Sequence, residues 1–186
     1  MKGLLLLAFI GVPAVEAEPL LETGYSYYSV TANSGHELPA SLNRATPIRY
    51  EGKPFHAYTD SRIRWRIWWQ TNNQVCSITR VKVFVDIAVT LPRLEDSPAV
   101  VREVWGRWYP DLVRHENGHR DNALAVARSL EGAIRALPAS IDCRMLEQRA
   151  NALGKRFIAE LAAEDRDYDA RTNYGETQGA WIRSHL

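Results

Sequence analysis

Residues 62–69 read Arg-Ile-Arg-Trp-Arg-Ile-Trp-Trp, and their alternation of charged and apolar side chains sets the fold class. Successive side chains of a β-strand point to opposite faces, so Ile63, Trp65, Ile67 and Trp69 share one face, and Arg62, Arg64 and Arg66 the other. Rows of arginine and tryptophan also occur on surfaces that bind nucleic acid or glycans. A solvent-facing row whose arginine stems cover aromatic rings is the commoner explanation, and we expect a half-buried strand.

A second strand follows this one along the chain. Asn72-Asn73 suits a tight turn, and residues 76–91 are rich in valine and isoleucine with a period close to two. The two strands together predict an antiparallel hairpin. A shorter aromatic and β-branched segment at residues 25–31 predicts one more strand nearer the N-terminus.

Long helices are expected after the hairpin. Ser97-Pro98 is typical of a helix start, and this helix is expected to run to Trp108, with Pro110 kinking it or beginning a new one. The next helix extends to Leu137, and a second long helix with an apolar stripe follows the break at Pro138. The pattern predicts an α+β fold in which an antiparallel sheet packs on long C-terminal helices.

Residues 1–17 have the composition of a signal peptide: Lys2, an apolar run, and Val15-Glu16-Ala17 as a cleavage site. The run is too short to cross a membrane, so we expect export to the periplasm or medium without stable membrane insertion. Residues 18–186 then form a single domain. Because basic residues exceed acidic ones by only one, the total charge does not indicate binding to nucleic acid or to an anionic membrane.

The chain has two cysteines, Cys76 and Cys143, and neither belongs to a Cys-x-x-Cys motif. In an exported protein an even number of cysteines favours a disulfide. We therefore expect a bond that joins the strand region to the C-terminal helix, with two free buried thiols as the alternative.

Residues 115–119 read His-Glu-Asn-Gly-His, which is the spacing H-E-x-x-H. On a helix this spacing sets two imidazoles one turn apart on the same face, where both can bind one zinc ion. Helical periodicity places His115 and His119 on the apolar stripe and Glu116 at its edge. One inward histidine is usually an ordinary core residue, but two with a glutamate between them indicate a zinc site in which Glu116 is the general base.

The helical hairpin suggests a third ligand. If the chain turns near residue 139, residues 159–163 of the returning helix lie level with the histidines. Glu164 is on the inward stripe and completes a His-His-Glu set, unless it is an ordinary solvated carboxylate. Asp121 is expected either to orient a histidine ligand from behind or to be solvated.

Several motifs together resemble the bacterial family of predicted secreted zinc-dependent proteases, a domain family of unknown function. The likeness spans nearly all of the mature chain and rests on Tyr27-Tyr28-Ser29-Val30, the Trp-rich strand, the two cysteines, Leu91-Pro92, the motif with its following Arg120-Asp121, and the closing Tyr168-Asp169, Thr172 and Gln178-Gly179. The resemblance implies a zincin-like fold, one zinc ion, and a peptide or protein substrate.

The family's closing pattern is Tyr-Asp-x-x-Thr-x-His-Gly-x-x-Gln-Gly, and this chain has Tyr174 where the pattern has histidine. If that histidine is the family's third ligand, the resemblance implies that Tyr174 binds the metal as a phenolate. The alternatives are that Asp169 or Glu164 takes its place, or that the site is weakened. The same segment implies that Tyr168 lies beside the metal ligands.

The sequence predicts a zinc-dependent metallopeptidase that cleaves peptide bonds with Glu116 as the base. An amidase acting on cell-wall cross-links would use the same residues in a cleft of different shape. A zinc-binding module without turnover is the third possibility. Tyr174 favours this last option, whereas Glu116 argues against it because zinc binding alone does not require it.

Overall fold

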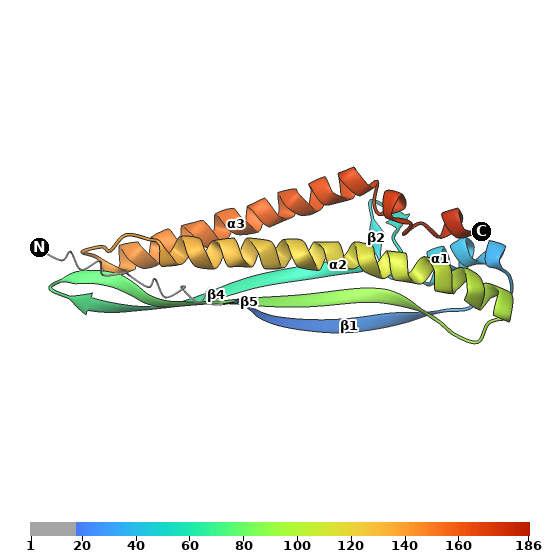
Figure 1. The fold of residues 1–186 in the computed structure, drawn as a ribbon, viewed down its shortest axis with the longest axis horizontal. Helices are drawn as coiled ribbons and strands as arrows, with labels where there is room; N and C mark the ends of the chain where they lie inside the picture. The colour runs from blue at the N-terminus through green and yellow to red at the C-terminus, as the bar shows by residue number, and fades with distance from the viewer. Residues whose placement is uncertain (1–17) are drawn as a thin grey trace, which may run out of the picture.

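The computed structural model describes residues 18–186, and in it two long helices lie along one face of a narrow sheet (Figure 1). The elements follow the order of an α+β protein, with the strands first and both long helices after them. The predicted signal peptide, residues 1–17, lies outside the described residues. None of the helices in residues 18–186 is long and apolar enough to cross a membrane.

The predicted hairpin is confirmed by strands β4 (Tyr58–Asn72) and β5 (Val75–Leu94), which pair in antiparallel fashion. Asn73 and Gln74 form the turn between them, with φ angles of 47° and 64°. The turn lies one residue later than the predicted Asn72-Asn73, and asparagine at its first position is one of the few residues that visits this left-handed region readily. Both strands extend beyond their predicted ends, where pairing with the neighbouring strands continues.

Strand β1 (Leu20–Val30) pairs with β5 in parallel, so the sheet has the order β1-β5-β4 and is mixed. The expectation of a purely antiparallel sheet is therefore corrected. The chain leaves β1 through η1 (Gly35–Glu37), α1 (Leu38–Ala45) and the small hairpin β2 (Arg49–Tyr50) and β3 (Lys53–Pro54). It then enters β4 in the opposite direction, and β5 reverses it again, which leaves β1 and β5 parallel.

Helix α2 (Ala99–Arg135) is continuous through Pro110, so the expectation that a new helix begins there is wrong, and the alternative of one helix that contains Pro110 holds. Pro110 is exposed, whereas Trp108 and Leu112 on the other side of the helix are buried. A proline inside a helix removes one backbone hydrogen bond. Because the buried side of α2 packs against the sheet on both sides of Pro110, packing keeps the helix intact.

The main core lies between α2 and the helix-facing side of β5. Every second residue of β5 is buried there, and α2 contributes Trp108, Ala127, Leu130 and Ile134. Helix α3 (Cys143–Thr172) then packs on α2, and the short η2 (Glu176–Gln178) and η3 (Ile182–His185) bring the chain back to α2. Burial of these side chains holds α2 at a fixed level along the strands.

The start of α3 is fixed to the sheet by the predicted disulfide, Cys76–Cys143, which the structure confirms. Ser140 extends this junction through two backbone hydrogen bonds with Cys76, of 2.6 and 2.9 Å. Further along α3, Gly154 lies directly under the indole of Trp65 from β4, so a β-carbon at this position would be 2.1 Å from the ring. The absence of a side chain at Gly154 therefore allows helix and strand to approach closely.

Candidate metal centre

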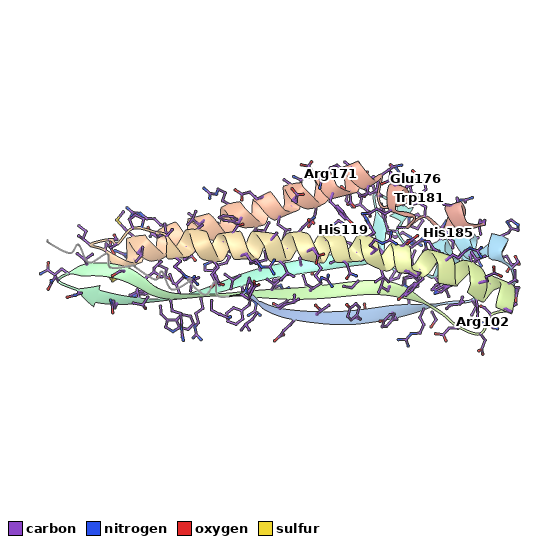
Figure 2. All side chains as sticks on the ribbon, in the orientation of Figure 1. Arg102, His119, Arg171, Glu176, Trp181 and His185 are labelled. Atoms are coloured by element: carbon purple, nitrogen blue, oxygen red, sulfur yellow. A yellow bond between two sulfur atoms is a disulfide. The ribbon has the colours of Figure 1, made fainter. Side chains whose placement is uncertain are left out.

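His115 and His119 lie one turn apart on α2, on the side that faces α3. His115 is 6% exposed and the ring centroids of the two histidines are 5.1 Å apart. Figure 2 marks His119 beneath the C-terminal part of α3. The helix periodicity thus places both imidazoles in one enclosed position between the helices, as the motif predicts.

Asp169 from α3 reaches both histidines. Its Oδ1 atom is 3.3 Å from Nε2 of His115 and 3.2 Å from Nε2 of His119. Two ligand atoms bound to one tetrahedral zinc ion are about 3.3 Å apart, given metal–ligand distances near 2.0 Å. Among residues 18–186, His115, His119 and Asp169 form the one group of three His, Cys, Asp or Glu side chains placed to hold a metal ion.

The other ring nitrogen of each histidine is held by an oxygen acceptor. Nδ1 of His115 is 2.9 Å from Oε1 of Gln178, and Nδ1 of His119 is 3.0 Å from Oδ1 of Asp165. A carboxylate oxygen can only accept, so Nδ1 of His119 carries the proton. In a neutral imidazole this leaves the Nε2 lone pair pointing at Asp169, as in a histidine oriented for metal binding.

The group carries an excess of negative charge. Three acidic side chains, Asp165, Asp169 and Glu116, surround the two histidines. Burial alone would lower the pKa of His119, but its hydrogen bonds to Asp165 and Asp169 raise the pKa to about 10. Burial acts to raise the pKa of Asp169, but its contacts with both histidines lower it to about 2. Both shifts report that the position between these side chains attracts a positive charge.

Glu116 is buried on α2 and contacts the sheet. Thr59 of β4 donates a hydrogen bond of 2.7 Å to Oε2 of Glu116. Burial raises the pKa of Glu116, and the bond from Thr59 opposes that shift. The contact fixes one carboxylate oxygen and leaves Oε1 without a hydrogen-bond partner among residues 18–186.

Tyr168 covers the site from α3. Its ring stacks on His115 with centroids 5.0 Å apart, and its hydroxyl donates to the backbone oxygen of His115 at 3.1 Å. This hydroxyl also lies 3.1 Å from Gln178. A β-carbon at Gly118 would be 2.1 Å from the hydroxyl oxygen, so the glycine of the motif makes room for Tyr168. The structure thus places Tyr168 beside both His115 and His119.

Tyr174 does not join the group, contrary to the preferred prediction for the third ligand. Its side chain is 54% exposed, and its ring contacts Phe55 with centroids 5.9 Å apart. The chain leaves α3 through Asn173 and Tyr174, both with positive φ, which turns the backbone so that Gln178 rather than Tyr174 returns to His115. The alternative third ligand, Asp169, is the one that lies in place.

Glu164 and Asp121 also lie away from the group. Glu164 pairs with Arg171 at 3.0 Å, and Asp121 pairs with Arg120 at 2.8 Å. The predicted level on the returning helix was wrong: residues 165–169 of α3, rather than residues 159–163, lie level with the histidines.

Three residues of the site were not found from the sequence: Asp165, Gln178 as a partner of His115, and Thr59. For Asp165 the signal is present, because Asp165 and Asp169 repeat on α3 the four-residue spacing of His115 and His119 on α2. Residues with this spacing share one helix face. Thr59 carries no comparable local signal.

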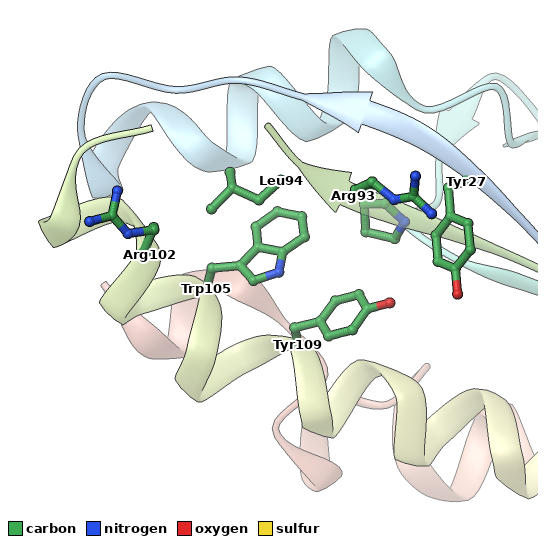
Figure 3. A pocket seen from close by; sticks show the side chains of 7 residues that line it. Tyr27, Arg93, Leu94, Arg102, Trp105 and Tyr109 are labelled. Atoms are coloured by element: carbon green, nitrogen blue, oxygen red, sulfur yellow. The ribbon is translucent and has the colours of Figure 1, made fainter. Parts of the chain in front are cut away.

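A separate groove of about 420 Å³ lies between the N-terminal part of α2 and the sheet. Figure 3 shows the rings of Trp105 and Tyr109 on α2, with Tyr27 and Arg93 across from them on the strands. None of its lining residues belongs to the histidine group, so we do not assign this groove to the metal centre.

A family model described as bacterial protein of unknown function (DUF922) matches residues 25–176. No match was found among curated proteins or among solved structures. The family description names no activity, so it supports the resemblance found in the sequence only at the level of the family. The matched range includes strands β2 to β5, part of β1, the histidine motif and Asp169, and the chain belongs to this bacterial family, DUF922.

Proposed function

We propose that the protein is a zinc-dependent hydrolase that cleaves peptide bonds, with a zincin-like site. One observation carries the proposal: His115 and His119 direct Nε2 at the same oxygen of Asp169 while acceptors hold their Nδ1 atoms. Two imidazole lone pairs facing a carboxylate repel one another unless a positive charge lies among them. His115, His119 and Asp169 are the residues that would hold the zinc ion.

The donor set fits zinc in chemistry as well as in spacing. Imidazole nitrogen and carboxylate oxygen are both ordinary zinc ligands, and three protein ligands leave a fourth position for water or substrate in catalytic sites. Asp165 and Gln178 supply the outer hydrogen bonds that usually orient histidine ligands. A bound zinc ion would lower the pKa of its water towards about 7 and polarise a substrate carbonyl.

The chain's own residues would then handle the proton. Thr59 holds Oε2 of Glu116, which leaves Oε1 to take a proton from the attacking water and to pass it to the leaving amine. Burial raises the pKa of Glu116, and a general base is most effective when its pKa approaches the working pH. The hydroxyl of Tyr168 is a donor close enough to stabilise charge on a substrate oxygen, provided that it leaves His115.

An amidase acting on cell-wall cross-links remains the runner-up within the same chemistry, since it would share each of these residues. The non-catalytic alternative loses its main support. It rested on Tyr174 at the position of a family histidine, and Asp169 can supply the third ligand instead.

Metal analysis of three purified proteins, the wild type, Glu116→Gln and Asp169→Ala, tests the proposal. We expect about one zinc ion per chain in the wild type and in Glu116→Gln, and a loss of zinc in Asp169→Ala because one of three ligands is gone. Hydrolysis of a broad peptide library is expected in the wild type alone. Glu116→Gln is matched in size, so a difference in activity at equal zinc content isolates the proton transfer.

Two results would contradict the proposal. Equal zinc content in the wild type and Asp169→Ala would remove Asp169 from the site. Full zinc loading with no cleavage of any peptide or cell-wall amide would leave a zinc-binding protein without turnover.

A further inference from the structure

The charges of the chain are segregated although they nearly cancel. Residues 61–85, which form most of the β4–β5 hairpin, contain five basic residues and no acidic one. The rest of the chain therefore has 18 basic residues against 22 acidic ones. The net charge of +1 thus conceals a basic hairpin attached to an acidic remainder.

These basic residues lie on the face of the sheet that the helices do not cover. The hairpin register sets Arg66 opposite Lys82 and Trp68 opposite Arg80. The alternate positions, such as Val81 and Val83, are buried on the other face, under the helices (Figure 1). We call the solvent-exposed set the basic face; it consists of Arg62, Arg64, Arg66, Arg80 and Lys82.

Most of the charge on the basic face has no local compensation. Arg64 pairs with Asp86 at 2.8 Å, whereas no carboxylate among residues 18–186 lies within 4.0 Å of Arg66 or Arg80. Like charges directly opposite one another on neighbouring strands destabilise a sheet. Arg66 and Lys82 occupy such opposed positions, and an external anion would relieve their repulsion.

The aromatic side chains on this face are already occupied. The guanidinium carbon of Arg80 lies 3.6 Å from the ring centroid of Trp68, and that of Arg66 lies 5.4 Å from it. The guanidinium carbon of Arg64 lies 5.5 Å from the ring centroid of Phe84. Single-stranded nucleic acids bind through base stacking on free aromatic faces. A layer of anionic headgroups needs only positive charge, and tryptophan is typical of the membrane interface.

We propose that the basic face of the β4–β5 hairpin docks on a membrane surface that carries anionic phospholipid headgroups. The contact is peripheral and uses the uncovered side of the sheet. The group of His115, His119 and Asp169 lies on the covered side of the sheet. Thr59, which contacts Glu116, precedes Arg66 by about 23 Å of strand. Docking through this face therefore leaves the metal group clear of the headgroups.

Sedimentation of the full chain with vesicles tests the proposal, without dependence on zinc or hydrolysis. We expect binding to phosphatidylglycerol vesicles that weakens as salt rises, and no binding to pure phosphatidylcholine. Each arginine near an anionic surface contributes about fivefold to partitioning, so Arg66→Gln with Arg80→Gln should lower it about 30-fold. Replacing the same two residues by lysine keeps the charge and should restore binding.

The matched control is Arg149→Gln with Arg156→Gln on α3, which removes the same net charge from exposed positions elsewhere. Partitioning should stay within about threefold of the wild type. Thermal melting of each variant verifies that it is folded. Equal loss in the control pair, equal binding to phosphatidylcholine, or tighter binding to a single-stranded oligonucleotide than to vesicles would each overturn the proposal.

Discussion

The two ends of α3 are held in place by different chemistry. Near the connection between the helices, the indole of Trp65 packs on Gly154 and a disulfide anchors Cys143. At the other end the helices meet through polar contacts, in which His119 reaches Asp165 and Asp169. Figure 1 shows α3 rising away from α2 towards this polar end. One end therefore secures the helices, and the other arranges polar groups around a position that attracts a cation.

Both ends depend on a glycine, and this similarity makes the comparison testable. At Gly154 a β-carbon would be 2.1 Å from Trp65, and at Gly118 it would be 2.1 Å from Tyr168. The same substitution, glycine to alanine, can therefore be made at an apolar contact and at a polar contact. If the two ends have separate roles, the same substitution should change stability at one end and metal affinity at the other.

The largest effect is expected from removing the disulfide with Cys76→Ser and Cys143→Ser. The bond closes a loop with a sequence separation of 67. Loss of such a constraint should lower the free energy of unfolding by about 4 kcal/mol, measured by urea denaturation. Zinc affinity of the remaining folded protein should change less than threefold. A folded double variant that does not bind zinc would contradict separate roles for the two ends, because zinc binding would then depend on the distant disulfide.

The glycine pair gives the next effect. Gly154→Ala should lower the free energy of unfolding by about 1–3 kcal/mol, because a rigid indole must move, and should leave zinc affinity unchanged. Gly118→Ala should instead weaken zinc binding about tenfold, because it displaces Tyr168 from His115. Gly132→Ala on α2 is the control: nothing lies within 4 Å of its β-carbon, and alanine should stabilise the helix by up to about 1 kcal/mol. The same response in all three variants would contradict the division of roles.

Gln178→Ala should weaken zinc binding about 10- to 100-fold, measured by competition with a chelator. The change removes the acceptor that holds Nδ1 of His115 but no ligand. The midpoint of thermal unfolding of the metal-free protein should fall only slightly, since Gln178 is outside the main core. An unchanged zinc affinity would show that His115 is oriented by its stacking on Tyr168 alone.

The last effect is spread over several pH units and concerns the contrast between two histidines. Burial lowers the pKa of His56 to about 4, whereas the carboxylates around His119 raise its pKa to about 10. The unfolded chain, with a histidine pKa near 6.5, therefore binds a proton before folded His56 does. The contribution of His56 to stability should therefore fall by up to about 1.4 kcal/mol per pH unit as the pH drops from about 6.5 to about 4, and this contribution should be constant above pH 6.5.

Urea denaturation of the wild type and of His56→Gln between pH 4 and pH 7 measures this slope. The variant should lose that part of the pH dependence, while its zinc content at pH 7 stays equal to that of the wild type. An identical slope in both proteins would mean that His56 is as easily protonated in the folded chain as in the unfolded one.

The elements of this fold were predictable where the pattern is local. The alternation around Trp65 and the asparagine turn predicted the hairpin, and the apolar stripes predicted both long helices. The parallel pairing of β1 was not predictable, since it depends on how the chain returns after α1. The local pattern also left open whether a new helix begins at Pro110, because packing of Trp108 and Leu112 overrides the local preference of proline.

The candidate metal centre, too, was predictable only where its residues belong to one local pattern. The spacing of His115 and His119 predicted one half of it, because both residues belong to one helix. Asp169 comes from another helix, and its level depends on a connection whose length could not be inferred from the break at Pro138. Tyr174 occupies the expected sequence position, but the positive φ angles of Asn173 and Tyr174 turn its side chain outward.

The parallel pairing of β1 with β5 fixes the order in which this chain can complete its sheet. Leu20 can pair only after Phe84, which is synthesised 64 residues later. Strands β4 and β5, by contrast, can pair from the turn between them as soon as both have been synthesised. Strand β1, which is synthesised first, is therefore the last strand to pair. Until then the unpaired backbone groups of β1 can form hydrogen bonds with other protein molecules. The nascent protein is therefore most prone to aggregate before β5 has formed.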